Sequence, residues 1–179
     1  TAEHSANSPW LFVGRISEEK GLVELLESWP PEEPLTVIGD GPDIDRAIAS
    51  AIGKQVTFRG PLPRREVFES LSGAKGLIFP SRCSESAAAL SFLEALSLGK
   101  PTIALRGSVV ADEVEEGELG IVADGWEDLI AVLKEIDRHW KRFARQALGA
   151  YAAKFTQENW LAKTLELYQD VLSSGEPSA

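Results

Sequence analysis

The sequence predicts an α/β fold, a Rossmann-like parallel sheet of about six strands with helices on both faces. Two observations carry this prediction. Short apolar runs alternate with segments of helical periodicity through residue 105, and the runs are continuously apolar instead of alternating with polar residues. Continuous apolar runs are typical of parallel strands, which are buried on both faces. The predicted strands are Trp10–Val13, Leu35–Ile38, Val56–Phe58, Gly76–Phe79, Thr102–Leu105 and Gly120–Ala123.

The segments between the first four strands each carry a helical apolar stripe. After the first strand, Ser17 is expected to cap a helix that ends at Pro30. After the second strand, Pro42 is expected to begin a helix, because proline is favoured in the first helical turn. The stripes are Leu22, Leu25, Leu26 and Trp29 in the first helix, Ile44, Ile48 and Ile52 in the second, and Val67, Phe68 and Leu71 in the third.

The second half of the chain is predicted to be mostly helical. A helix is expected between Ser84 and the Gly-Lys-Pro turn that ends at Pro101, and residues 107–117 are expected to form an acidic loop. Three helical segments follow, at residues 129–136, 140–155 and 160–172, and part of the apolar face of the last one is expected to be exposed, which invites weak self-association. Residues 1–9 are expected to form a linker, residues 10–174 one domain, and residues 175–179 a frayed tail.

The composition excludes several classes of function. A chain of 179 residues with 44% hydrophobic and 26% charged residues is typical of one soluble domain. The net charge of -10 disfavours a general nucleic-acid surface, so no nucleic-acid partner is expected. The sequence has no run of 18 apolar residues and no signal-peptide pattern, and its single Cys83 fits a reducing compartment, so a cytoplasmic location is expected. His4, Cys83 and His139 lack metal-ligand spacing, so no metal site is expected.

Two basic residues follow the first predicted strand, in the segment GRISEEKG. Arg15 leaves the end of the strand, and Lys20 lies in the first helical turn. A guanidinium and an ammonium group on one loop suit a diphosphate. The alternative is that both are solvated surface charges, and the spacing by itself favours that alternative, because charged residues are mostly exposed.

The segment SESAAALSFLEALSLGKP, residues 84–101, combines two carboxylates with a helix start. Glu85 lies near its beginning and Glu94 near its middle. The free N–H groups of a helix N-terminus favour an anion such as phosphate, and the carboxylates suit a hydroxyl-rich ligand. A nucleotide sugar has both features. The alternatives are that Glu94 is a solvated residue at the edge of an amphipathic helix, and that Glu85 is only an acid favoured near a helix N-terminus.

Six motifs occur in a defined order, and together they carry a family resemblance. They are GRxxxxKG at residues 14–21, VIGDGP at 37–42, VTFRGPLPRREV at 56–67, AKGLIFPS at 74–81, ES…LSFLEALSLGKP at 85–101 and FTQENWLAKTLELY at 155–168. From about Trp10 to Leu172, the chain resembles the carboxyl-terminal, donor-binding half of a GT-B retaining glycosyltransferase. The resemblance is to the large "glycosyl transferases group 1" type, family-four-like, which includes bacterial mannosyl- and glucosyltransferases.

The resemblance implies a role for each matching residue. The arginine and lysine of GRxxxxKG bind the donor diphosphate in that family; here they are Arg15 and Lys20. The first glutamate of the paired-glutamate motif contacts the transferred sugar, and the candidate is Glu85. The second binds the ribose hydroxyls and matches Glu94. The remaining matches involve mainly backbone, at Leu62 and Arg64 for the base and at Ala88, Ala89 and Leu90 for sugar and phosphate.

Two departures from the family pattern concern the sugar end of this site. The family's glutamates are eight positions apart, whereas Glu85 and Glu94 are nine apart. Counting back eight positions from Glu94 leads to Ser86, so either residue is a candidate for the first motif position. The turn between them usually holds glycine and an aromatic residue, but here it is an alanine run, and alanine tolerates positive φ poorly.

The resemblance also implies partners. The donor is expected to be a nucleoside-diphosphate sugar of UDP or GDP type, used without metal or other cofactor. A missing amino-terminal half is expected to supply the acceptor site, and a membrane-associated acceptor would bind through that half. The chain alone is therefore expected to be inactive. Two alternatives stay open: a non-catalytic nucleotide-sugar-binding or regulatory domain, and a GT-B-like epimerase, which ranks last because both histidines lie outside every motif.

Overall fold

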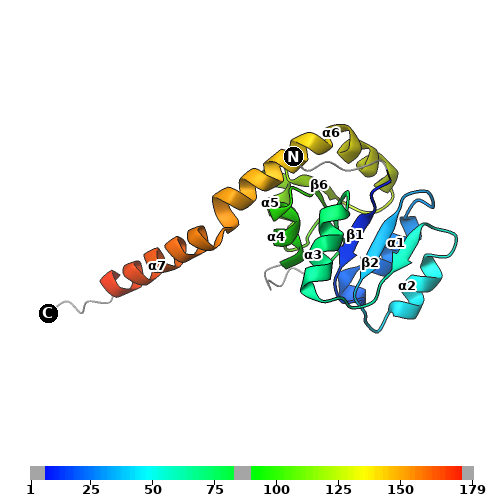
Figure 1. Ribbon diagram of the computed structural model, residues 1–179, viewed down its shortest axis with the longest axis horizontal. Coiled ribbons are helices and arrows are strands. Elements are labelled where there is room, and N and C mark those ends of the chain that lie inside the picture. The colour runs from blue at the N-terminus through cyan, green and yellow to red at the C-terminus, as the bar shows by residue number, and fades with distance from the viewer. Residues whose placement is uncertain (1–6, 83–89, 175–179) are drawn as a thin grey trace.

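The computed structural model describes residues 7–82 and 90–174, which form a parallel six-stranded sheet with helices on both faces (Figure 1). The strand order is β3-β2-β1-β4-β5-β6, and all neighbouring pairs are parallel. The predicted fold class and all six predicted strands are therefore confirmed. The strands are β1 (Trp10–Val13), β2 (Leu35–Ile38), β3 (Val56–Phe58), β4 (Gly76–Phe79), β5 (Thr102–Leu105) and β6 (Gly120–Ala123).

Each strand is followed by a helix, as parallel connections require. A short 3-10 helix, Glu18–Lys20, precedes the first α-helix, and a π-helical turn, Tyr151–Phe155, joins the last two. The helices are α1 (Leu22–Ser28), α2 (Ile44–Ser50), α3 (Arg64–Gly73), α4 (Leu90–Ser97), α5 (Ala111–Glu116), α6 (Leu129–Ala150) and α7 (Gln157–Ser174).

The sheet separates two hydrophobic cores. One core lies between the sheet and α1, α2 and α6, and the other lies between the sheet and α3, α4 and α5. Successive residues of β1 divide between them, with Trp10 and Phe12 in the first core and Leu11 in the second. This division follows from the two-residue period of a strand and explains why β1 is apolar at every position.

The acidic segment after β5 is a helix, and the prediction of a loop at residues 107–117 is wrong. α5 spans only six residues; it buries Ala111 and Val114, and Val114 packs in the second core. Its remaining residues are acidic, and Arg106 pairs with Glu115. Two buried positions among four acids leave too short an apolar stripe to be recognised in the sequence.

The first two helices begin later than predicted. The hydroxyl of Ser17 donates a hydrogen bond to Glu19 Oε1 at 2.6 Å and makes no cap bond, so its predicted capping role is wrong. α2 begins at Ile44, not at Pro42. The predicted stripe on α2 is confirmed at Ile44, which packs against the first core, and is wrong at Ile48 and Ile52, which are exposed while Ala47 is fully buried.

Of the two carboxyl-terminal helices, α6 packs on the sheet and α7 extends away from the domain (Figure 1). α6 is one continuous helix of 22 residues, and it contains the predicted helical segment 129–136 and the segment 140–155 as far as Ala150. α7 projects away from the sheet, and its exposed apolar face confirms the expectation from the sequence. The large apolar side chains exposed on α7 are Trp160, Leu161, Leu165, Leu167, Tyr168, Val171 and Leu172.

At the amino edge of the sheet, two lysines are buried just before β4 and β5. Lys75 Nζ pairs with Glu33 Oε1 at 2.7 Å and with Asp137 at 3.3 Å. Lys100 Nζ donates a hydrogen bond to the carbonyl of Ala74 at 2.8 Å. Indole rings cover both ammonium groups, that of Trp10 over Lys75 and that of Trp140 over Lys100.

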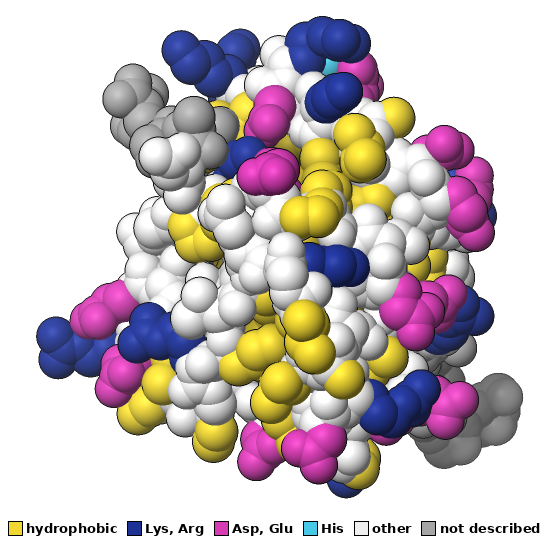
Figure 2. Space-filling view, turned by 90° about the vertical axis from the view of Figure 1, so that its right-hand side faces the viewer, with side chains coloured by type: hydrophobic (Ala, Val, Ile, Leu, Met, Phe, Trp, Pro, Cys, Tyr) yellow, Lys and Arg dark blue, Asp and Glu magenta, His cyan; other side chains and the backbone are white. Residues whose placement is uncertain are grey.

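The surface on the α1 and α2 side of the molecule carries mixed charge. Figure 2 views the molecule from the right-hand side of Figure 1, and on this face acidic and basic side chains are interspersed with apolar ones. Among the described helices, none has the length and apolar character needed to cross a bilayer.

Candidate functional site

The candidate site lies at the carboxyl edge of the sheet, where β1 and β4 are neighbours. The chain order of the strands reverses here, because β1 is followed along the sheet by β2 on one side and by β4 on the other. Open parallel sheets bind ligands beyond the carboxyl ends of their strands at such a point. The loop after β1 carries Arg15 and Lys20, and the segment after β4 leads to α4.

Direct contacts join the loop after β1 to the segment after β4. The carbonyl of Glu19 accepts hydrogen bonds from the backbone N–H of Arg82 at 3.0 Å and from the hydroxyl of Ser81 at 3.2 Å. The Arg82 guanidinium also pairs with Glu24 on α1. Gly21 adopts φ +67°, and a Cβ on it would lie 2.3 Å from the carbonyl oxygen of Pro80. Only glycine permits this close approach.

Arg15 and Lys20 are the two cationic residues of this loop. Arg15 is exposed and Lys20 is half-buried. Within residues 7–82 and 90–174, neither side chain forms an ion pair. Both lie near Glu19, whose pKa is held below its usual value mainly by the hydrogen bond from Ser17, then by its own backbone N–H, and further by the charges of Arg15 and Lys20. The loop therefore presents two cations beside two exposed carboxylates, Glu18 and Glu19.

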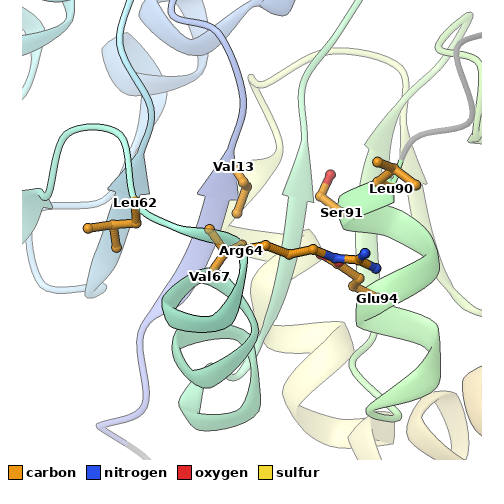
Figure 3. A pocket seen from close by; sticks show the side chains of 7 residues that line it. All are labelled: Val13, Leu62, Arg64, Val67, Leu90, Ser91 and Glu94. Carbon is orange, nitrogen blue, oxygen red and sulfur yellow. The ribbon is translucent and has the colours of Figure 1, made fainter.

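A cavity of about 450 Å³ opens beside this loop, between α3 and α4 (Figure 3). Its lining is mainly apolar, and its polar members are Arg64, Ser91 and Glu94. An apolar pocket with a few convergent polar groups is the usual form of a small-molecule site. The lining residues are Val13, Leu62, Arg64, Val67, Leu90, Ser91 and Glu94.

An ion pair crosses this cavity. Arg64 extends from the start of α3 toward Glu94 on α4, and its Nε donates a hydrogen bond to Glu94 Oε1 at 2.8 Å (Figure 3). The Glu94 side chain is 12% exposed, whereas that of Arg64 is 80% exposed. The sequence did not predict this pair, because the partners are 30 positions apart and meet only through the packing of α3 beside α4.

The structure brings four of the predicted site residues together, because Leu62, Arg64, Leu90 and Glu94 all line the one cavity. Leu90 is the first residue of α4, and its side chain is 62% exposed. Arg15 and Lys20 lie on the neighbouring loop and do not line the cavity.

Three further predicted positions, Glu85, Ala88 and Ala89, and the alternative Ser86, lie outside the described residues. Val13, Val67 and Ser91 line the cavity but were not predicted as site residues. Their places at the end of β1 and in the first turns of α3 and α4 are the only signal that indicates them.

The described residues hold no group of three or more His, Cys, Asp or Glu side chains placed to bind a metal ion. The polar groups of the cavity are instead one carboxylate, one hydroxyl and one guanidinium. Such groups bind hydroxyl and phosphate groups by hydrogen bonds.

Comparison with known proteins relates the chain to one family. Residues 9–139 match the family model described as "Glycosyl transferases group 1". The chain is 31% identical over 173 residues to sulfoquinovosyl transferase SQD2 of Arabidopsis thaliana, and this alignment covers 92% of the chain and 33% of that protein. It is 29% identical over 184 residues to D-inositol 3-phosphate glycosyltransferase of Corynebacterium glutamicum, and this alignment covers 91% of the chain and 43% of that protein. The chain thus spans about a third to two fifths of these relatives.

Solved structures share the fold. Sucrose-phosphate synthase of Thermosynechococcus elongatus aligns with a TM-score of 0.75 at 21% identity, over 96% of the chain and 47% of that protein. HepE of Anabaena in complex with UDP aligns with a TM-score of 0.70 at 19% identity, over 94% of the chain and 50% of that protein. The predicted half of a GT-B fold is therefore confirmed at the level of architecture.

Proposed function

The chain belongs to the group 1 glycosyl transferases, and we propose that it is the donor-binding domain of a retaining enzyme that transfers a hexose from a nucleoside-diphosphate sugar. The observation that carries the proposal is the juxtaposition of the Glu94 cavity with the basic loop of Arg15 and Lys20, at the point of the sheet where strand order reverses. UDP or GDP is the expected nucleotide of the donor.

The site's chemistry suits the three parts of a nucleoside diphosphate. The apolar side chains of Leu62 and Val13 offer a surface for the base. Glu94 supplies a carboxylate whose oxygens accept hydrogen bonds from the two ribose hydroxyls. Arg15 and Lys20 supply the positive charge that a diphosphate needs in a chain with a net charge of -10. Structures of HepE of Anabaena with UDP and with UDP-glucose support the same class of ligand.

The basic loop also suits the reaction. In glycosyl transfer, the bond between the anomeric carbon and the diphosphate oxygen breaks, and negative charge builds up on the departing nucleoside diphosphate. Arg15 and Lys20 would stabilise that charge more strongly in the transition state than in the bound donor, which is the condition for acceleration. The contact of Glu85 with the transferred sugar rests on the family motif.

The acceptor site is proposed to lie in the remainder of a longer protein. The chain spans less than half of its curated relatives, and α7 carries an exposed apolar face away from the sheet (Figure 1). Exposed apolar surface of this extent is typical of an interaction site. We therefore assign transferase activity to the longer protein and donor binding to this chain.

Titration of the chain with UDP, GDP, ADP and uridine tests the proposal. We expect at least one nucleoside diphosphate to bind, and UDP or GDP in preference to ADP. The double variant Arg15→Ala/Lys20→Ala should weaken diphosphate binding by at least about tenfold while leaving uridine binding unchanged, because charge-assisted hydrogen bonds to the phosphates are lost.

A matched control removes the same charge elsewhere. Arg138 and Lys141 are exposed on α6, so Arg138→Ala/Lys141→Ala lowers the net charge by the same two units without touching the carboxyl edge. It should bind diphosphates as the unmodified chain does. The proposal is wrong if no nucleotide binds, or if both double variants bind diphosphates equally well.

A further inference from the structure

We propose that Arg64 is a positioning residue that holds the Glu94 carboxylate toward the ribose diol, and that this pair sets a preference for ribonucleotides over 2′-deoxyribonucleotides. The inference rests on the proposed function, because it assumes that a nucleoside diphosphate occupies the cavity. It goes beyond that function by assigning a side-chain role to Arg64, for which the family resemblance implies a backbone contact to the base.

The geometry leaves the carboxylate available to a ligand. Arg64 uses one donor, Nε, on one oxygen, Oε1, of Glu94. An ionised carboxylate offers about four acceptor sites, so roughly three remain for two ribose hydroxyls. Among the described residues, Arg64 is the hydrogen-bond partner of this carboxylate. Arg64 therefore restricts the rotation of the Glu94 side chain without occupying all of its accepting capacity.

The burial of the two partners also points to a role in the site. An exposed ion pair contributes little to folding, and the Arg64 side chain is 80% exposed. Glu94 is 12% exposed and faces the cavity, so its orientation matters to any ligand there. A hydrogen-bonding group held in place before a ligand arrives loses less entropy on binding than a free one.

The neighbouring arginine provides a contrast within one helix. Arg65 pairs with Glu69 one turn along α3, with Nε 2.9 Å from Oε1 and side chains 89% and 60% exposed. This pair stays on the surface of a single helix and does not line the cavity. Arg64, in contrast, spans the cavity from α3 to α4 (Figure 3). Arg65→Ala is therefore a control that loses the same charge and the same kind of ion pair one residue away.

The test compares the dissociation constants of UDP and 2′-deoxy-UDP by calorimetry; GDP and 2′-deoxy-GDP replace them if GDP binds more tightly. Both members of a pair carry the same diphosphate, so effects of net charge cancel in their ratio. We expect the unmodified chain to prefer the ribonucleotide by about tenfold or more, the contribution of hydrogen bonds to a charged group. Arg64→Ala should weaken ribonucleotide binding by about three- to tenfold and 2′-deoxynucleotide binding by less, because the deoxynucleotide keeps only its 3′-hydroxyl for Glu94.

Two further variants complete the design. Arg65→Ala should keep the full ratio. Glu94→Ala should abolish the ratio, and adding Arg64→Ala to it should cause no further change in the ratio, because a positioning residue acts only through its partner. Thermal unfolding of each variant checks that the domain is folded.

Several results would overturn the inference. If Arg64→Ala tightens ribonucleotide binding, the arginine blocks the carboxylate instead of orienting it. If it weakens both nucleotides equally, Arg64 contributes only charge, and if it behaves as Arg65→Ala does, it has no role in binding. A chain that binds UDP without any ribose preference overturns this inference alone, whereas a chain that binds no nucleotide overturns the proposed function itself.

Discussion

The two edges of the sheet hold positive charge in different ways. At the amino edge, Lys75 and Lys100 are each 2% exposed, and each ammonium group donates a hydrogen bond to a protein group. At the carboxyl edge, Arg15 is exposed and Lys20 is half-buried, and neither forms an ion pair within the described residues. The difference separates buried cations that protein groups contact from cations at the edge where the proposed function places a ligand, and only the second kind remains accessible to that ligand.

At the amino edge, Lys75 joins segments that are distant in the sequence. Lys75 connects the turn before β2, through Glu33, to α6, through Asp137. The indole N–H of Trp10 donates to the same oxygen of Glu33 at 3.0 Å, and that of Trp140 donates to the Lys75 carbonyl at 2.7 Å. Such a network loses more than one interaction when its central residue is removed, because its partners then lose their hydrogen bonds as well.

The largest expected effect is therefore at the amino edge. Lys75→Ala should lower the free energy of unfolding by about 2–4 kcal/mol, because it removes the cation that compensates two carboxylates and leaves a void beside Trp10. Urea unfolding followed by circular dichroism measures this change. Lys134→Ala, an exposed lysine on α6, should stay within about 0.5 kcal/mol of the unmodified chain.

Nucleotide binding by Lys75→Ala provides a second test of the difference between the two edges. The folded fraction of Lys75→Ala should bind nucleoside diphosphate as tightly as the unmodified chain, because Lys75 lies at the other edge of the sheet. If Lys75→Ala is as stable as Lys134→Ala, or if its folded fraction has lost nucleotide binding, the division of the two edges into structural and ligand-binding charge is wrong.

The second prediction concerns the backbone of the carboxyl edge. Gly21→Ala adds a Cβ 2.3 Å from the Pro80 carbonyl oxygen at a residue with φ +67°. It should destabilise the domain by about 1–3 kcal/mol and also weaken diphosphate binding, because the loop that carries Lys20 must move away from the segment after β4. Unfolding in urea and UDP titration measure the two effects.

Gly53 separates backbone strain from this contact. It has φ +76° with no atom within 4 Å of an added Cβ. Gly53→Ala should therefore cost only about 1–2 kcal/mol, the strain of a left-handed alanine, and should leave UDP binding unchanged. Equal loss of stability in both variants, together with unchanged UDP binding in Gly21→Ala, would show that the contact between the loops is unimportant.

The sequence predicted the sheet well and the surrounding elements less well, for physical reasons. A strand buried on both faces is apolar at every position, so β1 and β4 could be located to the residue. α5 escaped prediction because it buries only Ala111 and Val114 among acidic residues. Ile48 and Ile52 suggested the wrong face of α2, because helix packing selected the small Ala47 for the core.

The sequence likewise predicted some features of the candidate site and missed others. Leu62, Leu90 and Glu94 were proposed from a motif order, and the cavity brings them together because each follows a strand and all the strands end at one edge. The ion pair between Arg64 and Glu94 was not predicted, because it depends on how two helices lie side by side and on the rotamer of a long side chain. Spacing along the chain contains no information on either.

The smallest expected effect is the contribution of Lys100, at the amino edge, to the pH dependence of stability. Burial lowers the pKa of Lys100 below its ordinary value of 10.5. The folded chain then binds this proton less readily than the unfolded chain, so the contribution of Lys100 to stability should rise with pH, from the lowered pKa of the folded state up to 10.5. Below that window, the contribution is constant and unfavourable.

Lys100→Met removes this titration while keeping most of the side-chain volume. The free energy of unfolding of the unmodified chain minus that of the variant should therefore increase as the pH rises through the window. The increase should be less than about 1.4 kcal/mol per pH unit, the limit for one proton. Urea unfolding at several pH values below 10.5 measures the difference, and taking the difference cancels the other titrating groups. Parallel curves would mean that the burial of Lys100 does not disfavour its charge, and that its hydrogen bond to Ala74 and the ring of Trp140 replace water fully.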